Sequence, residues 1–420
     1  YHAFSLWKTG KDYMGNFLPT YIHSLSEWRA PLIMYVTAPF VGLLGLSTFS
    51  VRLPVALLGV LDIYLIYLLA NQLFPKLKIN LGKFKITAGD VSALLLTLTP
   101  WHLHYSRVNF EVTLLLALLL LGTYWFIKFV KNPKLPFILF PIPLALTFYT
   151  YSTANIFTPL LAISLLLIYK PKLKDMFLDN WHVWLATLII MLPISYHLLL
   201  GQAAGRFGLV SIFTSQDLID QIVLTRIEPW VDATKEAAFH NKPLKFSTTL
   251  VTHYLQAFSS KFLFISGDPF PRHSVVGFGQ LLWVTFPLLI VGMFSLVKVF
   301  SKKSTQLVLA WLLISPLPSA LTIEGGTHAT RLFIMLPALI IASTVGLFHI
   351  QKLLGKKLKI IAAIAFAGAL LVNVTLYAHQ YSAHYRYKTA EYWQYGYQDI
   401  FIQLKPHLDT DSRIFINNTY

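Results

Sequence analysis

Residues 100–111, with the sequence PWHLHYSRVNFE, place two histidines, an arginine and a glutamate between two apolar runs. Arg107 and Glu111 are four residues apart, so they share one face if a helix begins near Ser106. A cation and a carboxylate on that face could hold a phosphate and a metal or hydroxyl, respectively. The same spacing fits an intrahelical ion pair at a membrane interface, with the neighbouring aromatic residues as an interfacial belt. The spacing alone leaves both interpretations open.

Three further connections between apolar runs also carry ionisable residues. They contain Glu27 and Arg29, then Asp268, Arg272 and His273, then Glu324, His328 and Arg331. An ionisable group at membrane depth costs roughly 2.5–3.5 kcal/mol on insertion scales, so such groups usually face a cavity or a partner. We therefore expect these connections to contribute to a substrate site. His102 and His104 are candidates for the same site, with packing at the membrane interface as the alternative.

Composition indicates which elements must position these residues. The chain has 420 residues, of which 55% are hydrophobic, 15% aromatic and only 12% charged, and its mean hydropathy is +0.59. This profile is typical of a polytopic membrane protein. The absence of cysteine excludes disulfides, thiolate metal sites and cysteine nucleophiles. The net charge of +16 comes from lysines in short clusters between apolar runs, so we expect no nucleic-acid partner.

Ten apolar runs predict helices long enough to cross a hydrocarbon layer of ~30 Å. They cover residues 53–74, 89–104, 109–130, 136–152, 154–170, 181–199, 278–299, 306–322, 330–349 and 358–378. Lysine clusters near residues 76–85, 128–134, 170–174, 298–303 and 352–359 occupy every second connection, which the positive-inside rule assigns to the cytoplasm. The connections with ionisable candidates then face the outside. We predict an all-α polytopic membrane protein in the plasma (inner) membrane.

The chain divides into three predicted regions. Residues 1–52 form a first outer loop with juxtamembrane helices, because Pro31, Pro39, Gly42 and Gly45 interrupt the apolar run 30–49 and favour an interfacial helix. Residues 53–378 form the membrane domain, with a large outer loop at 200–277. Residues 379–420 begin an outer-face soluble domain. Since Tyr1 is not a start methionine, we expect a further membrane helix to precede it.

Several segments in the same order resemble the GT-C glycosyltransferases, in the branch of protein O-mannosyltransferases and lipid A aminoarabinose transferases. They are TGKDYMGNFLPTY, RAPLIMY, LPVALLGVLDIYLIYLLANQLFP, SRVNFE, SGDPFPRHS and YWQYGYQDI. The resemblance covers nearly the whole chain. It depends on the order of these motifs and on their predicted location on the same face of the membrane. At Arg29-Ala30-Pro31 the chain departs from the Lys-Pro-Pro of the family, and arginine is not equivalent to lysine.

The resemblance implies a bacterial-type enzyme with a GT-C helical bundle. Its donor would be a sugar on a polyprenyl phosphate in the lipid bilayer, and its acceptor a hydroxyl of a protein, lipid or glycan. The catalytic aspartate of the family is expected upstream of Tyr1. Arg107, Arg29 and Arg331 are then candidates for the departing phosphate, and Glu111 for the acceptor or a metal. Single displacement would invert the anomeric centre. A divalent metal is compatible with these residues, but their pattern assigns no ligands.

Two other function classes remain open from the sequence. A secondary transporter also has many helices, but it places ionisable groups near the midplane in repeated halves, and the chain has no convincing internal repeat. A lipid-linked glycan polymerase or ligase would share the phosphate site and differ in what the loop 200–277 accepts.

Overall fold

The computed structural model describes residues 1–24, 27–81, 83–172, 174–201, 208, 210–228, 233–299 and 301–407. Its N-terminal part consists of α1 (His2–Thr9), β1 (Ile22–Ser24), β2 (Glu27–Arg29), α2 (Leu32–Leu44), α3 (Thr48–Leu73), β3 (Lys78–Leu81), β4 (Phe84–Thr87), α4 (Ala88–Leu98), α5 (Pro100–Tyr105), α6 (Glu111–Lys131), α7 (Pro141–Thr147), α8 (Ala154–Tyr169) and α9 (Trp181–Leu199).

The remainder consists of α11 (Gln216–Arg226), α12 (Ala233–Phe239), α13 (Lys242–Gln256), α14 (Phe286–Lys298), α15 (Lys303–Ile314), α16 (Leu317–Ala320), α17 (Ala329–Leu332), α18 (Leu336–Leu353), α19 (Lys356–His379), α20 (Arg386–Lys388) and α21 (Tyr397–Leu404). Each pair of strands forms an antiparallel hairpin, with Ile22 opposite Arg29 and Lys78 opposite Thr87. The mostly helical architecture predicted from the apolar runs is confirmed for the described residues.

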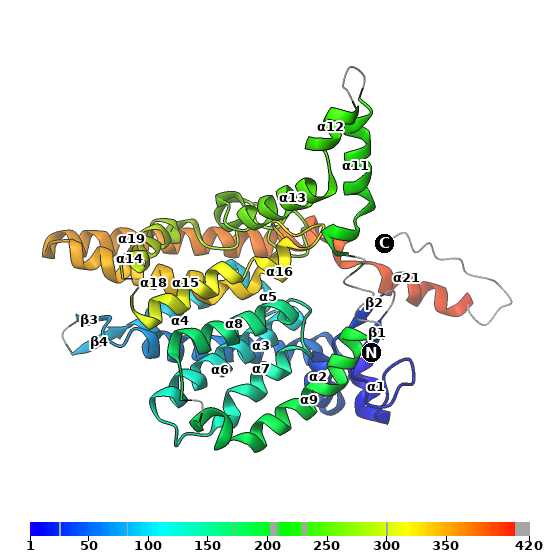
Figure 1. Cartoon of the computed structure of the whole chain (residues 1–420), viewed down its shortest axis with the longest axis horizontal. Helices are drawn as coiled ribbons and strands as arrows, with labels where there is room; N and C mark the ends of the chain where they lie inside the picture. Colours follow the sequence, from blue (N-terminus) through cyan, green and yellow to red (C-terminus); the bar gives the residue numbers. More distant parts are fainter. Residues whose placement is uncertain are drawn as a thin grey trace.

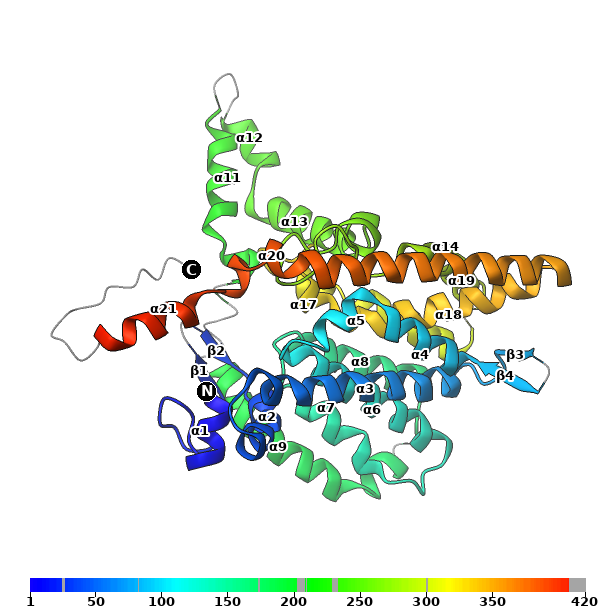
Figure 2. The ribbon, with the colours of Figure 1, turned by 180° about the vertical axis from the view of Figure 1, so that it is seen from behind.

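The long helices run in roughly one direction, and the two hairpins lie at opposite ends of the bundle (Figures 1 and 2). α6 is buried along most of its length and packs beside α3, α7 and α8. α14 packs along α18, and α19 covers one side with a largely exposed apolar surface. Exposed isoleucine and leucine side chains on α19 suit contact with lipid.

Within the described residues, five helical segments are long and apolar enough to cross a membrane. They are Thr48–Leu73, Glu111–Lys131, Trp181–Leu199, Ala329–Leu353 and Lys356–Lys388. The other predicted crossings coincide with helices that are shorter or interrupted, so the structure does not establish ten crossings. Proline explains several interruptions, because it lacks an amide hydrogen and disfavours a helical residue before it. Thr99, for example, is extended before Pro100, which separates α4 from α5.

The apolar run 30–49 forms α2, which has 13 residues. At 1.5 Å per residue it is about 20 Å long, less than the hydrocarbon thickness of ~30 Å. Gly45 ends it with φ 76°, a conformation that glycine adopts without strain. Its length agrees with the prediction that this run does not cross the membrane.

The predicted outer loop 200–277 contains α11, α12 and α13. Figure 1 shows α11 and α12 projecting from the bundle, whereas α13 lies along it and packs against α16. Residues after α19 continue as short helical segments to His407. The strand-like sequence SRIFINN lies outside the described residues. The division into three regions therefore stays a prediction.

α14 and α18 approach each other at two glycines. A Cβ atom added at Gly346 would overlap the carbonyl oxygen of Leu288, and one at Gly292 would overlap that of Ala342. We expect Gly346→Ala to destabilise the protein by about 1–3 kcal/mol, because the backbones must separate. Thermal unfolding in detergent measures this loss. Gly368→Ala on α19 is the matched control, since no described atom lies within 4 Å of its added Cβ; an equal loss in both variants would contradict the packing argument.

The positions of the hairpins predict how the chain is oriented. Lys83 lies in the lysine-bearing β3–β4 hairpin, and Tyr395, which is 81% exposed, lies beyond α19 at the opposite end. Because the chain contains no cysteine, Lys83→Cys and Tyr395→Cys each introduce a single thiol. We expect a membrane-impermeant maleimide to label Tyr395→Cys on intact spheroplasts and Lys83→Cys only after permeabilisation. The reverse pattern would invert the orientation.

Candidate active site

A cavity of about 950 Å³ opens at the end of the bundle near β1–β2. Its walls come from β2, the start of α3, the residues before α6, the turn after α7, α13, the loop 268–273, the segment 323–331 and Trp393. All of these segments lie in connections or at helix ends. The cavity therefore occupies the place where helical backbone gives way to polar loops.

Most of the residues expected at a substrate site line this cavity. They are Arg29, Glu111, Asp268, Arg272, His273, His328 and Arg331, and Glu324 joins them. Connections separated by more than a hundred residues in the sequence are thus brought together. Glu27 pairs with Ser24 through the strand register, and its side chain lies outside the described residues.

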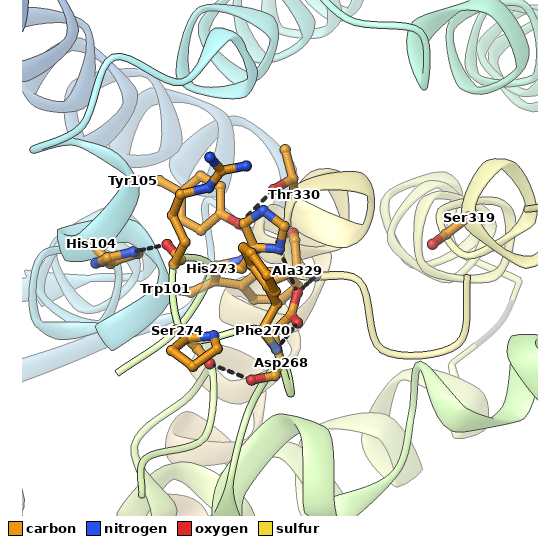
Figure 3. A network of polar contacts seen from close by, with 12 residues as sticks. Trp101, His104, Tyr105, Asp268, Phe270, His273, Ser274, Ser319, Ala329 and Thr330 are labelled. Carbon is orange, nitrogen blue, oxygen red and sulfur yellow. Dashed lines mark hydrogen bonds and ion pairs between the residues drawn. The ribbon is translucent and has the colours of Figure 1, made fainter. Parts of the chain in front are cut away.

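The carboxylate of Asp268 is the centre of a hydrogen-bond network (Figure 3). Its Oδ1 accepts from the amide of Phe270 at 2.8 Å, and its Oδ2 accepts from the amide of Ala329 at 2.7 Å. The same Oδ2 lies 3.1 Å from His273 Nδ1, which donates to it. The side chain is 6% exposed. Asp268 therefore ties its own loop to the start of α17.

Four arginines face the cavity in different environments. Arg29 Nη1 lies 3.4 Å from Glu111 Oε1, and Arg331 Nη1 donates to Thr322 Oγ1 at 2.6 Å. The Arg272 guanidinium lies over the Phe270 ring, 5.4 Å from its centre. Arg52, at the start of α3, is exposed to the cavity. This wall can bind an anion.

Two histidines of the cavity are held neutral by their surroundings. Burial, together with the charges of Arg331, His273 and Arg272, lowers the pKa of His328 to about 2. Burial also lowers the pKa of His253 on α13. Both imidazoles can therefore offer a lone pair at neutral pH.

The structure places Arg107 differently from the sequence expectation. α6 begins at Glu111 and not near Ser106, because α5 ends in successive turns and Phe110 is extended. Arg107 and Glu111 consequently do not share a helical face. The Arg107 guanidinium lies 4.7 Å from the centre of the Tyr381 ring and is not among the cavity-lining groups. Glu111, in contrast, is the first residue of α6 and faces the cavity.

His102 and His104 are buried inside the bundle and do not line the cavity. His104 Nε2 donates to the carbonyl oxygen of Arg272 at 2.8 Å, so it supports the loop that carries Arg272 and His273. His102 Nε2 lies 3.7 Å from Asp62 Oδ2 within the bundle. The carboxylate oxygens of Asp62 make no hydrogen bond with the described residues.

Several cavity residues were not singled out from the sequence. Arg52, His253, Gln256 and Trp393 belong to this group. Arg52 lies at the edge of an apolar run, and His253 and Gln256 lie on a helix of the predicted outer loop. The sequence indicated only that these residues lie on the outer face of the membrane. This did not distinguish them from other polar residues of the outer loops.

Residues 28–199 match the family model of the dolichyl-phosphate-mannose-protein mannosyltransferases. A segment of 111 residues is 30% identical to the putative mannosyltransferase YycA of Bacillus subtilis (strain 168) and covers 26% of this chain and 15% of that protein. The structure resembles the oligosaccharyltransferase of Archaeoglobus fulgidus with a TM-score of 0.50 and 14% identity, over 84% of this chain and 44% of that one in its complex with Zn and sulfate. For the apo form, at the same TM-score and identity, the shares are 93% and 54%.

Over residues 28–199 the chain is thus similar to membrane mannosyltransferases of the GT-C superfamily. This confirms the resemblance found in its motifs. The likeness to the archaeal protein shows the fold alone, and the chain spans well under two thirds of each of these relatives. The family match contains Arg29 and Glu111, whereas the segments with Asp268 and His328 lie outside it.

The network around Asp268 predicts a structural role that can be measured. Asp268→Ala leaves the amides of Phe270 and Ala329 without their acceptor, at a cost of about 1–3 kcal/mol for each buried donor. We expect a clear fall in the thermal unfolding temperature in detergent. Glu324→Ala, an exposed carboxylate of the same cavity, should change stability by less than about 0.5 kcal/mol. Equal stability of both variants would show that the network does not hold the loop.

Proposed function

We propose that this chain transfers a sugar from a polyprenyl-phosphate donor to an acceptor hydroxyl, with the cavity as its active site. The observation that carries the proposal is the wall of Arg29, Arg52, Arg272 and Arg331 in one cavity at a helix end. A lipid phosphate places its charge at the membrane interface, where such a cavity is accessible while the tail stays in hydrocarbon.

The arginines are suited to the departing phosphate. The guanidinium presents several N–H donors in a planar fork that matches phosphate oxygens and stays charged at any physiological pH. When the bond between the anomeric carbon and the phosphate oxygen breaks, its electron pair remains on the phosphate. Fixed cations stabilise that developing charge without reorganisation. We assign this role to Arg272 and Arg331, with Arg52 at the mouth of the cavity.

Glu111 and Arg29 form the opposite, internally paired part of the wall. Glu111 begins α6, where the helix dipole stabilises a carboxylate. We assign to Glu111 the orientation of the acceptor hydroxyl, with Arg29 fixing the carboxylate. Attack from this side, opposite the phosphate, is a single displacement that inverts the anomeric centre. The proton of the hydroxyl passes to a carboxylate base, which contributes typically 10²–10⁴ in rate.

The cavity is proposed to face the outside of the plasma (inner) membrane. The lysine-bearing β3–β4 hairpin lies at the other end of the bundle, and lysine-rich connections are typical of the cytoplasmic side. α11 and α12 then extend from the outer end and offer a surface on which a protein, lipid or glycan acceptor can lie.

A transfer assay with radiolabelled polyprenyl-phosphate mannose tests this function. We expect Arg331→Gln to lower kcat/KM by about 10²–10³, because one donor to the transition-state charge is lost. Arg386→Gln is the matched control, since this exposed arginine contacts its neighbour Tyr387 and does not line the cavity. Purified protein of each variant is compared by thermal unfolding to exclude misfolding.

Arg107→Gln tests whether an arginine outside the cavity lining contributes to transfer. Since the Arg107 guanidinium lies over Tyr381 and not in the cavity lining, we expect a smaller loss than for Arg331→Gln. A loss as large as that of Arg331→Gln would return Arg107 to the phosphate site. Full activity of Arg331→Gln would remove the proposed phosphate contact.

A further inference from the structure

Asp268, His273 and His328 form a compact cluster that the proposed sugar transfer does not require. Each offers one ligand atom, and these three atoms lie within 4.8 Å of one another. Two of the residues belong to the loop 268–273, and the third precedes α17, far away in the sequence. All three line the cavity, so a ligand held by them would be accessible from it.

The imidazole of His328 is poorly explained by packing alone. Its Nδ1 is buried and makes no hydrogen bond with the part of the chain that the structure describes. An unsatisfied buried polar atom destabilises the folded state. The ring packs against His273 with ring centroids 4.7 Å apart at an angle of 33°. A ligand that accepts the imidazole lone pair would satisfy it.

The other two ligands are oriented by the protein. Backbone amides of Phe270 and Ala329 fix both oxygens of Asp268, and His273 is held between Phe270 and Phe110 with ring centroids 5.1 Å and 6.1 Å away. Hydrogen bonds to a ligating carboxylate and fixed imidazole rings are typical of metal sites, where they orient the ligands and raise affinity.

We propose that Asp268, His273 and His328 bind one divalent transition-metal ion, with Zn²⁺ as the best match, and leave a coordination position open to the cavity. Two imidazoles and one carboxylate favour Zn²⁺ over Mg²⁺ or Ca²⁺, which prefer oxygen ligands. Ligands of one Zn²⁺ at about 2.1 Å in a tetrahedral site are about 3.4 Å apart. The three ligand atoms lie within 4.8 Å of one another, so binding requires them to approach, and the imidazole rings would have to rotate.

The neighbouring charges predict what occupies the open position. Arg272 precedes His273 directly and Arg331 lies three residues after His328, so a bare dication would be repelled from both sides. An oxyanion bound to the metal and to these guanidinium groups removes the repulsion. Binding of an oxyanion at this position does not depend on a particular sugar donor, because inorganic phosphate offers the same oxygen ligands.

Zinc binding is measured on the full chain, purified in detergent with a tag that lacks histidine and stripped with a chelator. Titration against a chromophoric zinc indicator should give one Zn²⁺ per chain, and Co²⁺ should give the visible absorption of a low-symmetry site. We expect His328→Ala and His273→Ala to weaken binding about 10- to 100-fold or more. The unfolding temperature of His328→Ala without metal is measured alongside, so that loss of binding is assigned to the ligand only where the variant stays folded. Inorganic phosphate should tighten binding in the wild type.

Two control variants distinguish this site from other histidines. His253→Ala removes an imidazole of the same cavity outside the cluster, and His384→Ala removes the exposed His379–His384 pair, whose Nε2 atoms lie 3.3 Å apart. Both should keep the tight site. Zinc affinity that is unchanged in His328→Ala, or lost in His384→Ala, would overturn the proposal, as would the absence of a stoichiometric site. Because no sugar donor is present, these outcomes leave the proposed transfer to be judged by its own assay.

Discussion

The Asp268 carboxylate holds together the two connections that supply most ionisable groups of the cavity. Its two oxygens accept from amides on both connections and from His273, so neither segment can move without leaving a buried donor unpaired. The penalty for such a donor in a low-dielectric environment is larger than the net value of an ordinary hydrogen bond. Charged residues far apart in the sequence are thereby kept at fixed positions around one space.

The segment 100–111 supports this arrangement mainly through hydrogen bonds from α5 to the two connections. Tyr105 Oη lies 2.8 Å from Thr330 Oγ1, and Trp101 Nε1 donates to the carbonyl oxygen of Ala329 at 3.2 Å (Figure 3). Together with the bond from His104 to the Arg272 carbonyl, they join α5 to both connections of the cavity. Trp101 and His104 therefore donate hydrogen bonds to backbone carbonyl groups of the two connections, although the sequence made His104 a candidate for the substrate site. Of the ionisable residues in this segment, Glu111 alone lines the cavity among the described residues, beside Val108, Asn109 and Phe110.

The sequence predicted the helices well and the site in part. Apolar length identifies helices because buried or lipid-facing backbone must satisfy its own hydrogen bonds, and each predicted run indeed contains a helix. The positions of the lysines predict which connections share one face of the membrane. This prediction grouped Arg29, Asp268, His328 and Arg331, and all four line one cavity. Arg107 was misplaced because the start of α6 depends on how α5 ends, and turn geometry has no comparable periodic signal. Pro100 marks one interruption, but the number of crossings requires the three-dimensional arrangement.

The two sides of the cavity differ in net charge, which the amino-acid composition alone does not indicate. On one side Arg29 and Glu111 neutralise each other across 3.4 Å. On the other side Asp268 is already engaged by two amides and His273, so it compensates Arg272 and Arg331 poorly. The second side is therefore the more favourable place for an anion, and the first for a neutral hydroxyl. This difference in charge between the two sides supports the proposal that the phosphate of a donor binds near Arg272 and Arg331 and the acceptor hydroxyl near Glu111.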